Sequence, residues 1–221
     1  MTSLVLGTKL VIEEKVMINI GVLASGRGTN LQAIIEAIEG GKIEGRISIV
    51  ISDNSDAYAL KRAKQYNIDT RYINFKSYKN REDYDKEIIK ALEEKKIDLV
   101  VLAGYMRILS PFFINAYKNK IMNIHPALLP SFPGLHAQRQ AVEYGAKVSG
   151  CTVHFVDEGV DSGPIVLQKS VEVKDDDTEE LLEERILKEE HQIYPKAIQL
   201  FSEGRLIIKG RRIFIKEVDS K

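Results

Sequence analysis

The sequence predicts an α/β fold: an open, mostly parallel twisted sheet with helices on both faces and an antiparallel C-terminal portion. Three observations lead to this prediction. Short apolar runs alternate with segments of helical period through residues 18–103. These runs are continuously apolar, which is typical of strands buried on both faces. After residue 104 the pattern changes to two neighbouring β-runs joined by a loop, which favours an antiparallel hairpin.

The first half of the chain supplies the parallel strands and their crossover helices. Residues 18–24 form an apolar run that ends in a glycine-containing loop at residues 25–29. A helix follows, because apolar side chains recur at helical spacing from Leu31 to Ile38, and Gly40 ends it. The further elements expected in this half are a strand over 47–51, a helix over 57–66, a strand over 70–73, a helix over 79–95 and a strand over 98–103.

The second half begins with a short helix opened by Pro111, since proline suits the first turn of a helix. The elements expected after it are a strand over 121–124, a helix over 137–144, a hairpin of strands 149–156 and 164–173, and a final edge hairpin over 205–215. The acidic run at 175–180 is interpreted as the start of a long helix that Asp177 or Thr178 caps, because carboxylates stabilise the positive end of a helix. That helix is expected to end near Glu203.

The composition excludes several classes of protein. With 221 residues and 44% hydrophobic side chains, the chain can bury a sizeable core and is neither disordered nor collagen-like. Its 32 basic side chains equal its 32 acidic ones, which argues against a broad nucleic-acid or membrane surface and favours a small-molecule partner. The lone Cys151 is expected to be a buried thiol in a cytoplasmic protein. No apolar run approaches the roughly 18 residues of a membrane span, and residues 1–16 are expected to be an extension of unknown role.

The loop at residues 25–29 is a candidate anion site. A glycine loop between a strand and a helix brings free backbone N–H groups and the positive helix end together, which suits phosphate. A dinucleotide-binding loop would carry a third glycine where this chain has Leu31, although Asp53 after the next strand is compatible with a ribose-binding acid. The structural alternative is an ordinary tight turn in which Thr29 merely caps the helix.

Asn123 and His125 form a second candidate site. They lie two residues apart at the carboxyl end of an expected strand, where ligands collect in open α/β sheets, and so project to the same face. The amide can donate to a developing oxyanion, and the imidazole can move a proton near neutral pH. Asp161, on a tight loop, could orient that imidazole or accept its proton. The alternatives are a turn-capping asparagine, a structural histidine and an Asx-turn aspartate.

Around these residues the sequence resembles the glycinamide ribonucleotide formyltransferases, folate-dependent enzymes of purine synthesis, from about Ile18 to Phe214. Four motifs match in order: Ala-Ser-Gly-Arg-Gly-Thr-Asn-Leu-Gln at 24–32, Ala-Gly-Tyr-Met-Arg-Ile-Leu at 103–109, Asn-Ile-His-Pro-Ala-Leu-Leu-Pro at 123–130, and His-Phe-Val-Asp-Glu-Gly-Val-Asp-Ser-Gly-Pro at 154–164. The resemblance implies a Rossmann-like formyltransferase fold in one domain over residues 17–221. It also implies a phosphate-binding half (17–104) and a folate-binding and catalytic half (105–221).

The resemblance further implies a reaction, in which the formyl group of 10-formyltetrahydrofolate passes to the primary amine of glycinamide ribonucleotide. Attack of the amine on the formyl carbon gives a tetrahedral oxyanion. By match, Asn123 donates to that oxyanion, His125 stabilises it and takes part in proton transfer, and Asp161 assists through hydrogen bonding or a water molecule. The implied partners are these two small molecules, without nucleic acid or membrane, and the implied state is a monomer or homodimer. No spacing among the four histidines suggests a metal site, and the transfer needs none.

Binding residues also follow from the match. Gly28, Thr29 and Asn30 would hold the phosphate of the ribonucleotide and Glu190 its ribose hydroxyls, although Glu190 would otherwise be an ordinary acid on a helix surface. The implied folate-binding residues are Arg81, Met106, Arg107, Ile108, Leu109, Asn123, Asp157, Glu158, Gly159, Val160 and Asp161. For the apolar members of this set the alternative is core packing, and for the first arginine it is a solvated helix charge.

Two positions depart from the family pattern. Ala127 stands where relatives often have serine, and the neighbouring Leu-Leu-Pro is expected to preserve the turn. Leu187 lies one helical turn before the implied ribose contact, where some relatives place a polar substrate contact, so one ribonucleotide contact is in question while the activity is not. The remaining histidines, His136, His154 and His191, are expected to be structural.

Four other functions compete with this one. Methionyl-tRNA formyltransferase shares the Asn-x-His and Asp chemistry but needs a further C-terminal domain and a basic surface for tRNA; few residues follow Pro164 here, and the charge is balanced. A formyl-folate hydrolase would carry an extra N-terminal regulatory domain. A non-catalytic nucleotide- or folate-binding module would keep the glycine loop and lose the catalytic trio. An NAD-dependent oxidoreductase is disfavoured by Leu31.

Overall fold

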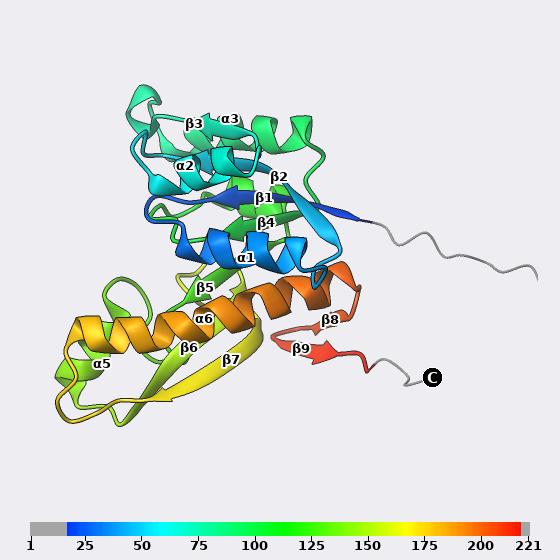
Figure 1. Cartoon of the computed structure of the whole chain (residues 1–221). Coiled ribbons are helices and arrows are strands. Elements are labelled where there is room, and N and C mark those ends of the chain that lie inside the picture. Colours follow the sequence, from blue (N-terminus) through cyan, green and yellow to red (C-terminus); the bar gives the residue numbers. More distant parts are fainter. Residues whose placement is uncertain (1–16, 218–221) are drawn as a thin grey trace, which may run out of the picture.

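A seven-stranded sheet organises the chain (Figure 1). The computed structural model describes residues 17–217, so the expected extension over 1–16 lies outside the described residues. The strand order is β3-β2-β1-β4-β5-β6-β7, in which β1 to β5 pair in parallel while β6 runs antiparallel to β5 and β7 to β6. The strands are β1 (Ile18–Leu23), β2 (Gly45–Ser52), β3 (Thr70–Tyr72), β4 (Leu99–Leu102), β5 (Ile121–His125), β6 (Val148–Phe155) and β7 (Ile165–Glu172). The predicted fold class is confirmed.

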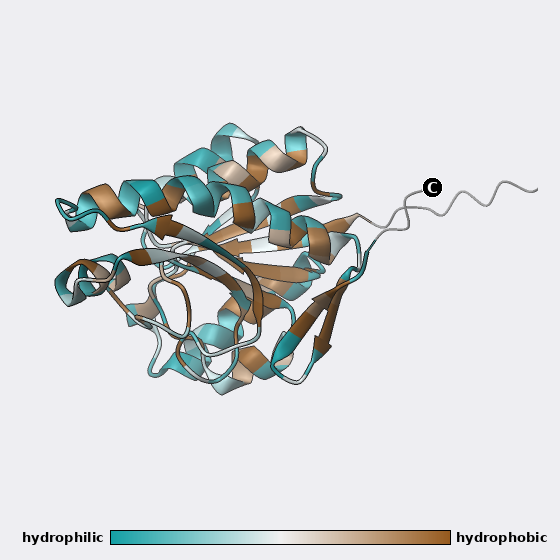
Figure 2. Cartoon of the chain, turned by 90° about the horizontal axis from the view of Figure 1, so that it is seen from below, coloured by the Kyte–Doolittle hydropathy of each residue, from teal (hydrophilic) through white to brown (hydrophobic). Residues whose placement is uncertain are grey.

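Helices cover both faces of this sheet. Apolar side chains of α1, α2, α5 and α6 join one hydrophobic cluster, and those of α3 and α4 join a second cluster on the opposite face. The helices are α1 (Thr29–Glu39), α2 (Tyr58–Gln65), α3 (Arg81–Glu94), α4 (Pro111–Ala116), α5 (Ala137–Tyr144) and α6 (Glu179–Ser202), with a 3₁₀ turn η1 (Phe75–Ser77) before α3. Figure 2 shows the hydrophobic residues concentrated on the strands and the hydrophilic ones on the outer surfaces of the helices.

The central strands are apolar throughout because both of their faces are buried. In β1, Val22 belongs to the first cluster and Leu23 to the second. Val101 and Val100 divide in the same way in β4, and all four side chains are fully buried. Successive side chains of a strand point to opposite faces, so a strand between two layers of helices needs apolar residues at every position.

Helix α6 begins at a threonine cap. The Thr178 hydroxyl oxygen accepts a hydrogen bond from Leu181 N at 3.3 Å, so Thr178 and not Asp177 caps the helix. Asp177 instead accepts from Lys174 N at 2.8 Å, in the turn before the cap. The acidic run predicted to open a helix therefore does so.

A tyrosine of α6 anchors the helix over the centre of the sheet. The Tyr194 hydroxyl lies 3.0 Å from Leu102 O and 2.8 Å from Met122 O, and these carbonyls belong to β4 and β5. The tyrosine is fully buried. Its single O–H donor is thus shared between buried backbone acceptors of two neighbouring strands.

The final hairpin differs from the expectation in one respect. Strands β8 (Leu206–Lys209) and β9 (Arg212–Ile215) turn at Gly210 as expected, but they form a two-stranded sheet of their own and not an edge of the main sheet. The edge prediction was therefore wrong. The hairpin is held by side chains, because Leu206, Ile208 and Ile213 pack against the first hydrophobic cluster. Its turn is fixed by the Arg211 Nη2 group, which donates to Ser162 O at 2.7 Å.

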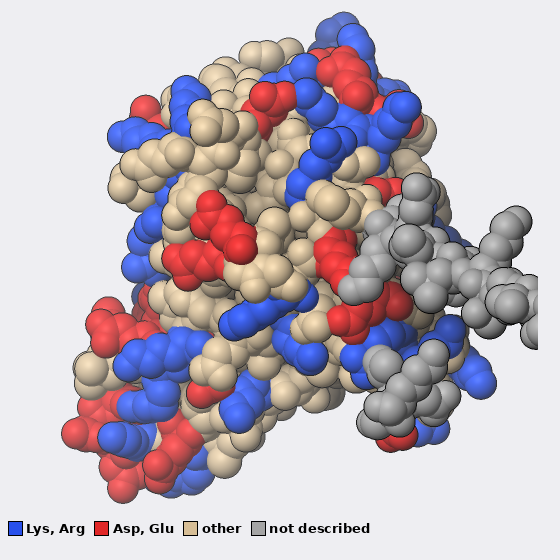
Figure 3. Space-filling model, turned by 45° about the vertical axis from the view of Figure 1, so that its right-hand side comes forward, with Lys and Arg blue, Asp and Glu red and all other residues tan. Residues whose placement is uncertain are grey.

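The surface agrees with the balanced composition. On the face drawn in Figure 3, Lys and Arg are intermixed with Asp and Glu, so that face presents no field of a single sign. Within residues 17–217 no helix is long and apolar enough to cross a membrane.

Candidate active site

Two loops meet at the carboxyl ends of β1 and β4. The glycine loop follows β1, and residues 103–110 follow β4. Ser25 N donates to Gly104 O at 3.0 Å, and Met106 N donates to the Ser25 hydroxyl oxygen at 3.0 Å, so the loops lie side by side. Between β1 and β4 the order in which strands are added to the sheet also reverses. Such a switch point is where open α/β sheets bind their ligands.

The glycine loop requires glycine at residue 28. Gly28 is the N-cap of α1 with a φ of 70°, and a Cβ at this position would lie 2.8 Å from the Cα of Ala59. Thr29 is the first residue of the helix, and no side chain caps it, so the alternative in which Thr29 is the cap is wrong. The first turn of α1 therefore keeps backbone N–H groups as donors for an anion.

Asn30 and Glu190 join α1 to α6 beneath this loop. Asn30 Nδ2 donates to Glu190 Oε2 at 2.8 Å, and the two residues are 8% and 7% exposed. The alternative of a helix-surface acid is therefore wrong for Glu190. Burial raises the pKa of its carboxyl, and the Asn30 hydrogen bond acts in the opposite direction. Asn30 Oδ1 is buried without a partner in the described part of the chain, which leaves an acceptor for a ligand.

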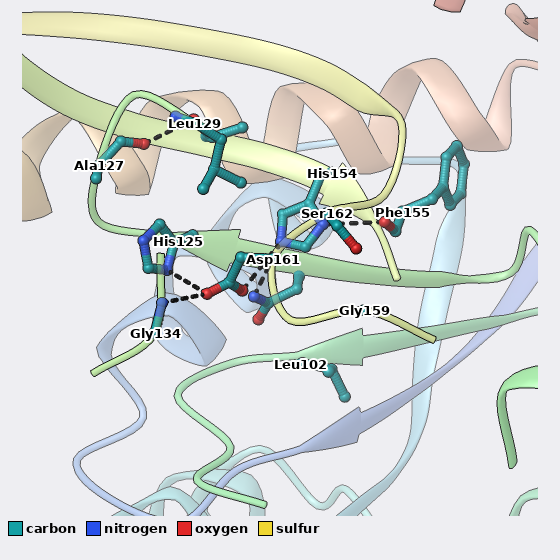
Figure 4. Close-up of polar contacts among 12 residues, drawn as sticks. Leu102, His125, Ala127, Leu129, Gly134, His154, Phe155, Gly159, Asp161 and Ser162 are labelled. Atoms are coloured by element: carbon teal, nitrogen blue, oxygen red, sulfur yellow. Dashed lines mark hydrogen bonds and ion pairs between the residues drawn. The ribbon is translucent and has the colours of Figure 1, made fainter. Parts of the chain in front are cut away.

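The three residues Asn123, His125 and Asp161 converge at the carboxyl end of β5. His125 Nδ1 lies 3.3 Å from Asp161 Oδ2, and the same oxygen accepts from Gly134 N at 2.8 Å (Figure 4). His125 is 4% exposed and Asn123 is half-buried two residues before it on the strand. Asp161 comes from the loop after β6 and has a φ of 49°. Sequence segments almost forty residues apart thus place an amide, an imidazole and a carboxylate together.

The surroundings of His125 decide which nitrogen carries its proton. Nε2 lies 2.8 Å from Phe132 O, and because a carbonyl only accepts, the neutral ring is protonated there. Nδ1 faces the Asp161 carboxylate, which also only accepts, so this contact becomes a hydrogen bond when the ring takes up a second proton. Burial lowers the pKa of His125, while the Asp161 carboxylate acts against that effect. Burial raises the pKa of Asp161, but the neighbouring His154 and the Gly134 N–H outweigh it and leave that pKa below its usual value.

His154 belongs to the same cluster, which the sequence did not indicate. Its Nε2 lies 3.2 Å from Asn123 Nδ2 and 3.6 Å from Asp161 Oδ1, and its Nδ1 lies 2.9 Å from Phe155 O. Figure 4 shows its ring beside the Asp161 carboxyl. The signal that could have found it is register, since the antiparallel pairing of β5 and β6 sets His154 directly opposite Asn123. The expectation that His154 is only structural did not include its contacts with Asn123 and Asp161.

Residues Met106 to Leu109 divide between the surface and the core. Met106 and Ile108 are 64% and 61% exposed, whereas Leu109 is 4% exposed and packs in the second cluster. The core-packing alternative therefore holds for Leu109 and is wrong for the other two. Two exposed apolar side chains in one loop are a surface that an apolar ligand can cover.

Arg107, between them, is held in place from two sides. Its Nε donates to Asp53 Oδ2 at 2.8 Å, and its guanidinium lies 4.2 Å from the centre of the Phe75 ring. Asp53, the candidate ribose-binding acid of a dinucleotide site, is thus engaged with an arginine of the loop after β4. This weakens the dinucleotide alternative.

The loop at residues 157–161 closes on itself. Asp157 Oδ1 accepts from Gly159 N at 3.2 Å and from the Ser162 hydroxyl at 2.5 Å. Glu158, Gly159 and Val160 are exposed at its tip. The loop therefore presents its tip to solvent while its last residue, Asp161, turns inward to His125.

Arg81 lies beside the far end of the 103–110 loop. It is the exposed first residue of α3 and lines a shallow surface hollow with Ser110 and Pro111. Asp85, one turn later, accepts from Ser110 N at 2.6 Å and so holds the end of the 103–110 loop. The role of Arg81 towards folate stays a prediction.

The remaining titratable candidates have structural surroundings. His136 is the exposed N-cap of α5, with Nδ1 3.5 Å from Glu179 Oε1. Cys151 is buried as predicted, and burial raises the pKa of its thiol to about 12, so it is no nucleophile at neutral pH. Over residues 17–217 no group of three or more His, Cys, Asp or Glu side chains could hold a metal ion. The Ala127 carbonyl accepts from the Thr152 hydroxyl at 2.7 Å, a backbone contact that needs no serine.

Comparisons with known proteins show the family of this chain. A family model described as formyl transferase matches residues 18–198. Phosphoribosylglycinamide formyltransferase of Escherichia coli is 47% identical over 188 residues, which cover 85% of this chain and 89% of that protein. The crystal structure of glycinamide ribonucleotide transformylase 1 from Symbiobacterium toebii superimposes with a TM-score of 0.91 at 53% identity, covering 96% of this chain and 99% of that one. A formyltetrahydrofolate deformylase from Pseudomonas syringae has a TM-score of 0.85 at 25% identity, and this chain covers 66% of its length.

The chain that carries this switch-point sheet, glycine loop and Asn–His–Asp cluster is a formyltransferase, because the family model described as formyl transferase matches most of its length. At 47% identity over 89% of the Escherichia coli protein, the chain belongs to the phosphoribosylglycinamide formyltransferase family. It is accordingly a formyltransferase of purine biosynthesis, and 10-formyltetrahydrofolate is the co-substrate of that family.

Proposed function

We propose that the enzyme transfers the formyl group of 10-formyltetrahydrofolate to the primary amine of glycinamide ribonucleotide, giving N-formylglycinamide ribonucleotide and tetrahydrofolate. The observation that carries this proposal is the cluster of Asn123, His125 and Asp161 at the carboxyl end of β5. The anion-binding turn of α1 and the exposed loop after β4 are hydrogen-bonded to each other beside the switch point. Two ligands bound at these loops would meet at one place.

The ribonucleotide binds at the glycine loop and α6. Its phosphate accepts from the backbone N–H groups of Gly28, Thr29 and Asn30, where the helix dipole favours negative charge. Its ribose hydroxyls bind Glu190, whose buried carboxyl Asn30 holds in place. The unpartnered Asn30 Oδ1 supports this assignment, because a buried acceptor without a partner calls for a donor such as a hydroxyl.

The folate binds across the loop after β4. Met106 and Ile108 cover the faces of the pterin, backbone groups around Arg107 and Leu109 hydrogen-bond its edge, and the loop from Asp157 to Asp161 closes over it. Glu158, Gly159 and Val160 lie at the tip of that loop, Asn123 lies at the formyl end, and Arg81 serves as a nearby cation. The exposure of the two apolar side chains supports this, because covering them removes apolar area from water at about 25 cal/mol per Å².

Transfer proceeds by direct attack. The amine nitrogen bonds to the formyl carbon, whose oxygen becomes an oxyanion, and the bond from that carbon to N10 of the folate then breaks. Asn123 Nδ2 has two N–H donors, of which one lies beside His154 Nε2 at 3.2 Å and the other is left for the oxyanion. The amine loses one proton and N10 gains one, so the reaction needs a group that can accept and return a proton.

His125 and Asp161 supply that proton path. A proton taken up at His125 Nδ1 lies beside the Asp161 carboxylate, which stabilises the imidazolium. Burial lowers the pKa of His125 and so favours the neutral ring, which is the form that can accept a proton. The protonated ring can then stabilise the oxyanion or return the proton to the leaving nitrogen.

The division of the chain follows from the two ligands. Residues 17–104 are the phosphate-binding half and residues 105–221 the folate-binding and catalytic half of one domain. One continuous sheet running through both halves supports a single domain. The proposal includes a cytoplasmic location, which a buried thiol without a disulfide favours. Whether the enzyme is a monomer or a homodimer is decided by light scattering at the concentration used for the assay.

One assay separates this function from its rivals. The protein is mixed with 10-formyltetrahydrofolate and each acceptor in turn, and the release of tetrahydrofolate is followed. Turnover that requires glycinamide ribonucleotide supports the proposal. Turnover without any acceptor would identify a hydrolase, the activity named for the Pseudomonas syringae structure, and turnover with methionyl-tRNA would identify the tRNA enzyme. No turnover with any acceptor contradicts the proposal and favours a binding module.

A further inference from the structure

An arginine of the glycine loop has no place in the mechanism above. Arg27 stands between Gly26 and Gly28, and its side chain is 72% exposed. One of its Nη groups forms an ion pair with the Glu183 carboxylate of α6. An arginine carries five N–H donors, so this contact leaves further donors of Arg27 accessible to solvent or to a ligand.

The backbone at Arg27 is fixed even though its side chain is exposed. Arg62 Nε donates to Arg27 O at 3.0 Å, and the Arg62 guanidinium lies 4.8 Å from the centre of the Tyr58 ring. Ala59 N donates to Gly26 O at 3.1 Å on the other side of the same turn. Helix α2 thus holds the loop, and the Arg27 side chain projects from a constant position next to the first turn of α1.

Helix α6 presents two carboxylates to this loop. Glu183 pairs with Arg27, and Glu190 pairs with Asn30. The two glutamates are seven residues apart, hence two helical turns or about 10 Å apart on the same face. Leu187 lies between them on that face and can offer no hydrogen bond to a substrate.

This arrangement creates an electrostatic problem for a phosphate. A dianion on the N–H groups of Gly28 to Asn30 would lie near the Glu183 carboxylate, and like charges repel. Arg27 is the cation that already pairs with that carboxylate. A planar guanidinium can hold a carboxylate with one edge and a phosphate with another.

We propose that Arg27 is a specificity-determining residue for the phosphate of the substrate: Glu183 holds its guanidinium in the free enzyme, and the substrate phosphate shares it in the complex. This inference rests on the proposed function, since it concerns the ribonucleotide site. It adds a charged side chain to a phosphate site that is otherwise made of backbone N–H groups. Arg27 lies on the side of the site where α6 has Leu187, which cannot form a hydrogen bond with a substrate.

The first test is the substitution Arg27→Gln. The variant keeps a side chain of similar length and loses the charge. We expect KM for glycinamide ribonucleotide to rise roughly ten- to hundredfold, as for the loss of a hydrogen bond to a charged group, with kcat and the KM for 10-formyltetrahydrofolate unchanged. Arg46→Gln is the matched control, because Arg46 is exposed at the amino end of β2 and bonds to Asn19. An Arg27→Gln enzyme with the KM of the control would overturn the proposal.

A second substitution distinguishes a role of Arg27 in phosphate binding from a role in holding the glycine loop to α6. Glu183→Gln breaks the same ion pair but leaves the arginine in place. If Arg27 acts on the phosphate, the KM for glycinamide ribonucleotide does not rise in this variant, because the guanidinium is then free to bind substrate. An equal rise in both variants would mean that the pair only holds the loop to α6, and the proposal would be wrong.

A binding measurement decides the question independently of turnover. Calorimetric titration with ribose 5-phosphate, and with ribose as the phosphate-free probe, is carried out on the wild type, Arg27→Gln and Arg46→Gln. We expect Arg27→Gln alone to weaken binding of ribose 5-phosphate, by the same factor as its rise in KM. Equal binding by all three proteins contradicts the role of Arg27. Absence of turnover in the wild type would refute the proposed function, while this titration would still decide the inference.

Discussion

The donors and acceptors of single side chains set the chemistry at the residue scale. Successive side chains of a strand point to opposite faces, so Asn123 and His125, two residues apart in β5, lie on one face. Asp161 has a left-handed backbone conformation, and its carboxylate points back to that face. His154 then faces the asparagine from the next strand. Asn123 Nδ2 lies beside His154 and His125 Nε2 beside Phe132 O, so the amide and the imidazole are oriented before substrate arrives. This orientation is the condition for stabilising charge that develops in a transition state.

Removal of either group should slow the chemical step. We expect Asn123→Ala to lower kcat by about 10²–10³, the cost of one oxyanion donor, and His125→Ala by about 10²–10⁴, the contribution of a general acid–base. Steady-state kinetics measures both. His136→Asn is the control, since His136 is an exposed helix cap in a left-handed conformation that asparagine tolerates. Urea midpoints close to the wild type verify folding, and kcat values near the wild type would refute these roles.

The protonation of His125 should depend on Asp161 in a defined direction. Burial lowers the pKa of His125, and the Asp161 carboxylate raises it by favouring the charged ring. Asp161→Asn removes the carboxylate that raises the pKa of His125, while the burial that lowers this pKa remains. The pKa of His125 should therefore fall further below about 6.5. A titration of the His125 ring protons by NMR measures this in both proteins. A higher pKa in the variant would show that the carboxylate does not act on this ring.

At the scale of elements, the start of α1 and the course of α6 define the ribonucleotide side of the site. Gly28 lets the chain enter α1 against α2 without a side-chain cap, so the N–H groups of the first turn stay available. Helix α6 packs against α1, with Glu183 paired to Arg27 of the glycine loop and Glu190 to Asn30 of the first turn of α1. The position of one helix end against the side of another, and not any single residue, makes this part of the site.

A pair of glycine substitutions tests the close approach of α1 and α2. Gly28 and Gly41 have φ values of 70° and 69°, but a Cβ at Gly41 would meet no atom within 4 Å, whereas at Gly28 it would meet Ala59 at 2.8 Å. Gly41→Ala should therefore lose only the roughly 1–2 kcal/mol of a left-handed alanine. Gly28→Ala should lose about 1–3 kcal/mol more and raise the KM for the ribonucleotide. Equal losses in urea unfolding would contradict the predicted clash.

At the scale of the whole molecule, the reversal of strand direction after β5 assembles the catalytic cluster. Antiparallel pairing brings β6 back along β5 and sets His154 opposite Asn123, so β6 ends beside the amino end of β5. The 157–161 loop then turns back, and Asp161 reaches both histidines of the cluster. Helix α6 then returns across the sheet, and Tyr194 connects it to both β4 and β5. The phosphate-binding and catalytic parts are therefore held by one tyrosine as well as by the sheet.

That connection should make a measurable contribution to stability. Tyr194→Phe removes a buried hydroxyl and leaves two strand carbonyls without this donor, so we expect the free energy of unfolding to fall by about 1–3 kcal/mol. Tyr72→Phe is the control, because Tyr72 is 46% exposed and should change stability by less than about 0.5 kcal/mol. Chemical denaturation measures both. A loss in Tyr194→Phe no larger than in the control would mean that the carbonyls find other donors.

Most elements of the fold could be predicted from local patterns in the sequence. Apolar runs, helix caps and turn residues act over a few positions, so the strands, the helices and the turn at Gly210 could all be predicted from the residues alone. The cap of α6 was predicted as Asp177 or Thr178, and the structure chose Thr178. The last hairpin was assigned wrongly to an edge of the sheet, because a strand pattern says that a segment is extended but not which strand it will pair with.

The sequence by itself determined the fold class, the glycine loop and the spacing of Asn123, His125 and Asp161, because these depend on short-range geometry and on motifs. Only the tertiary structure decided what depends on packing between distant segments. It buried Glu190 against Asn30, exposed Met106 and Ile108, and brought His154 to the cluster through strand register. It also paired Arg27 with Glu183 across 156 residues of chain. No local pattern encodes such contacts, since each is set by the docking of one element on another.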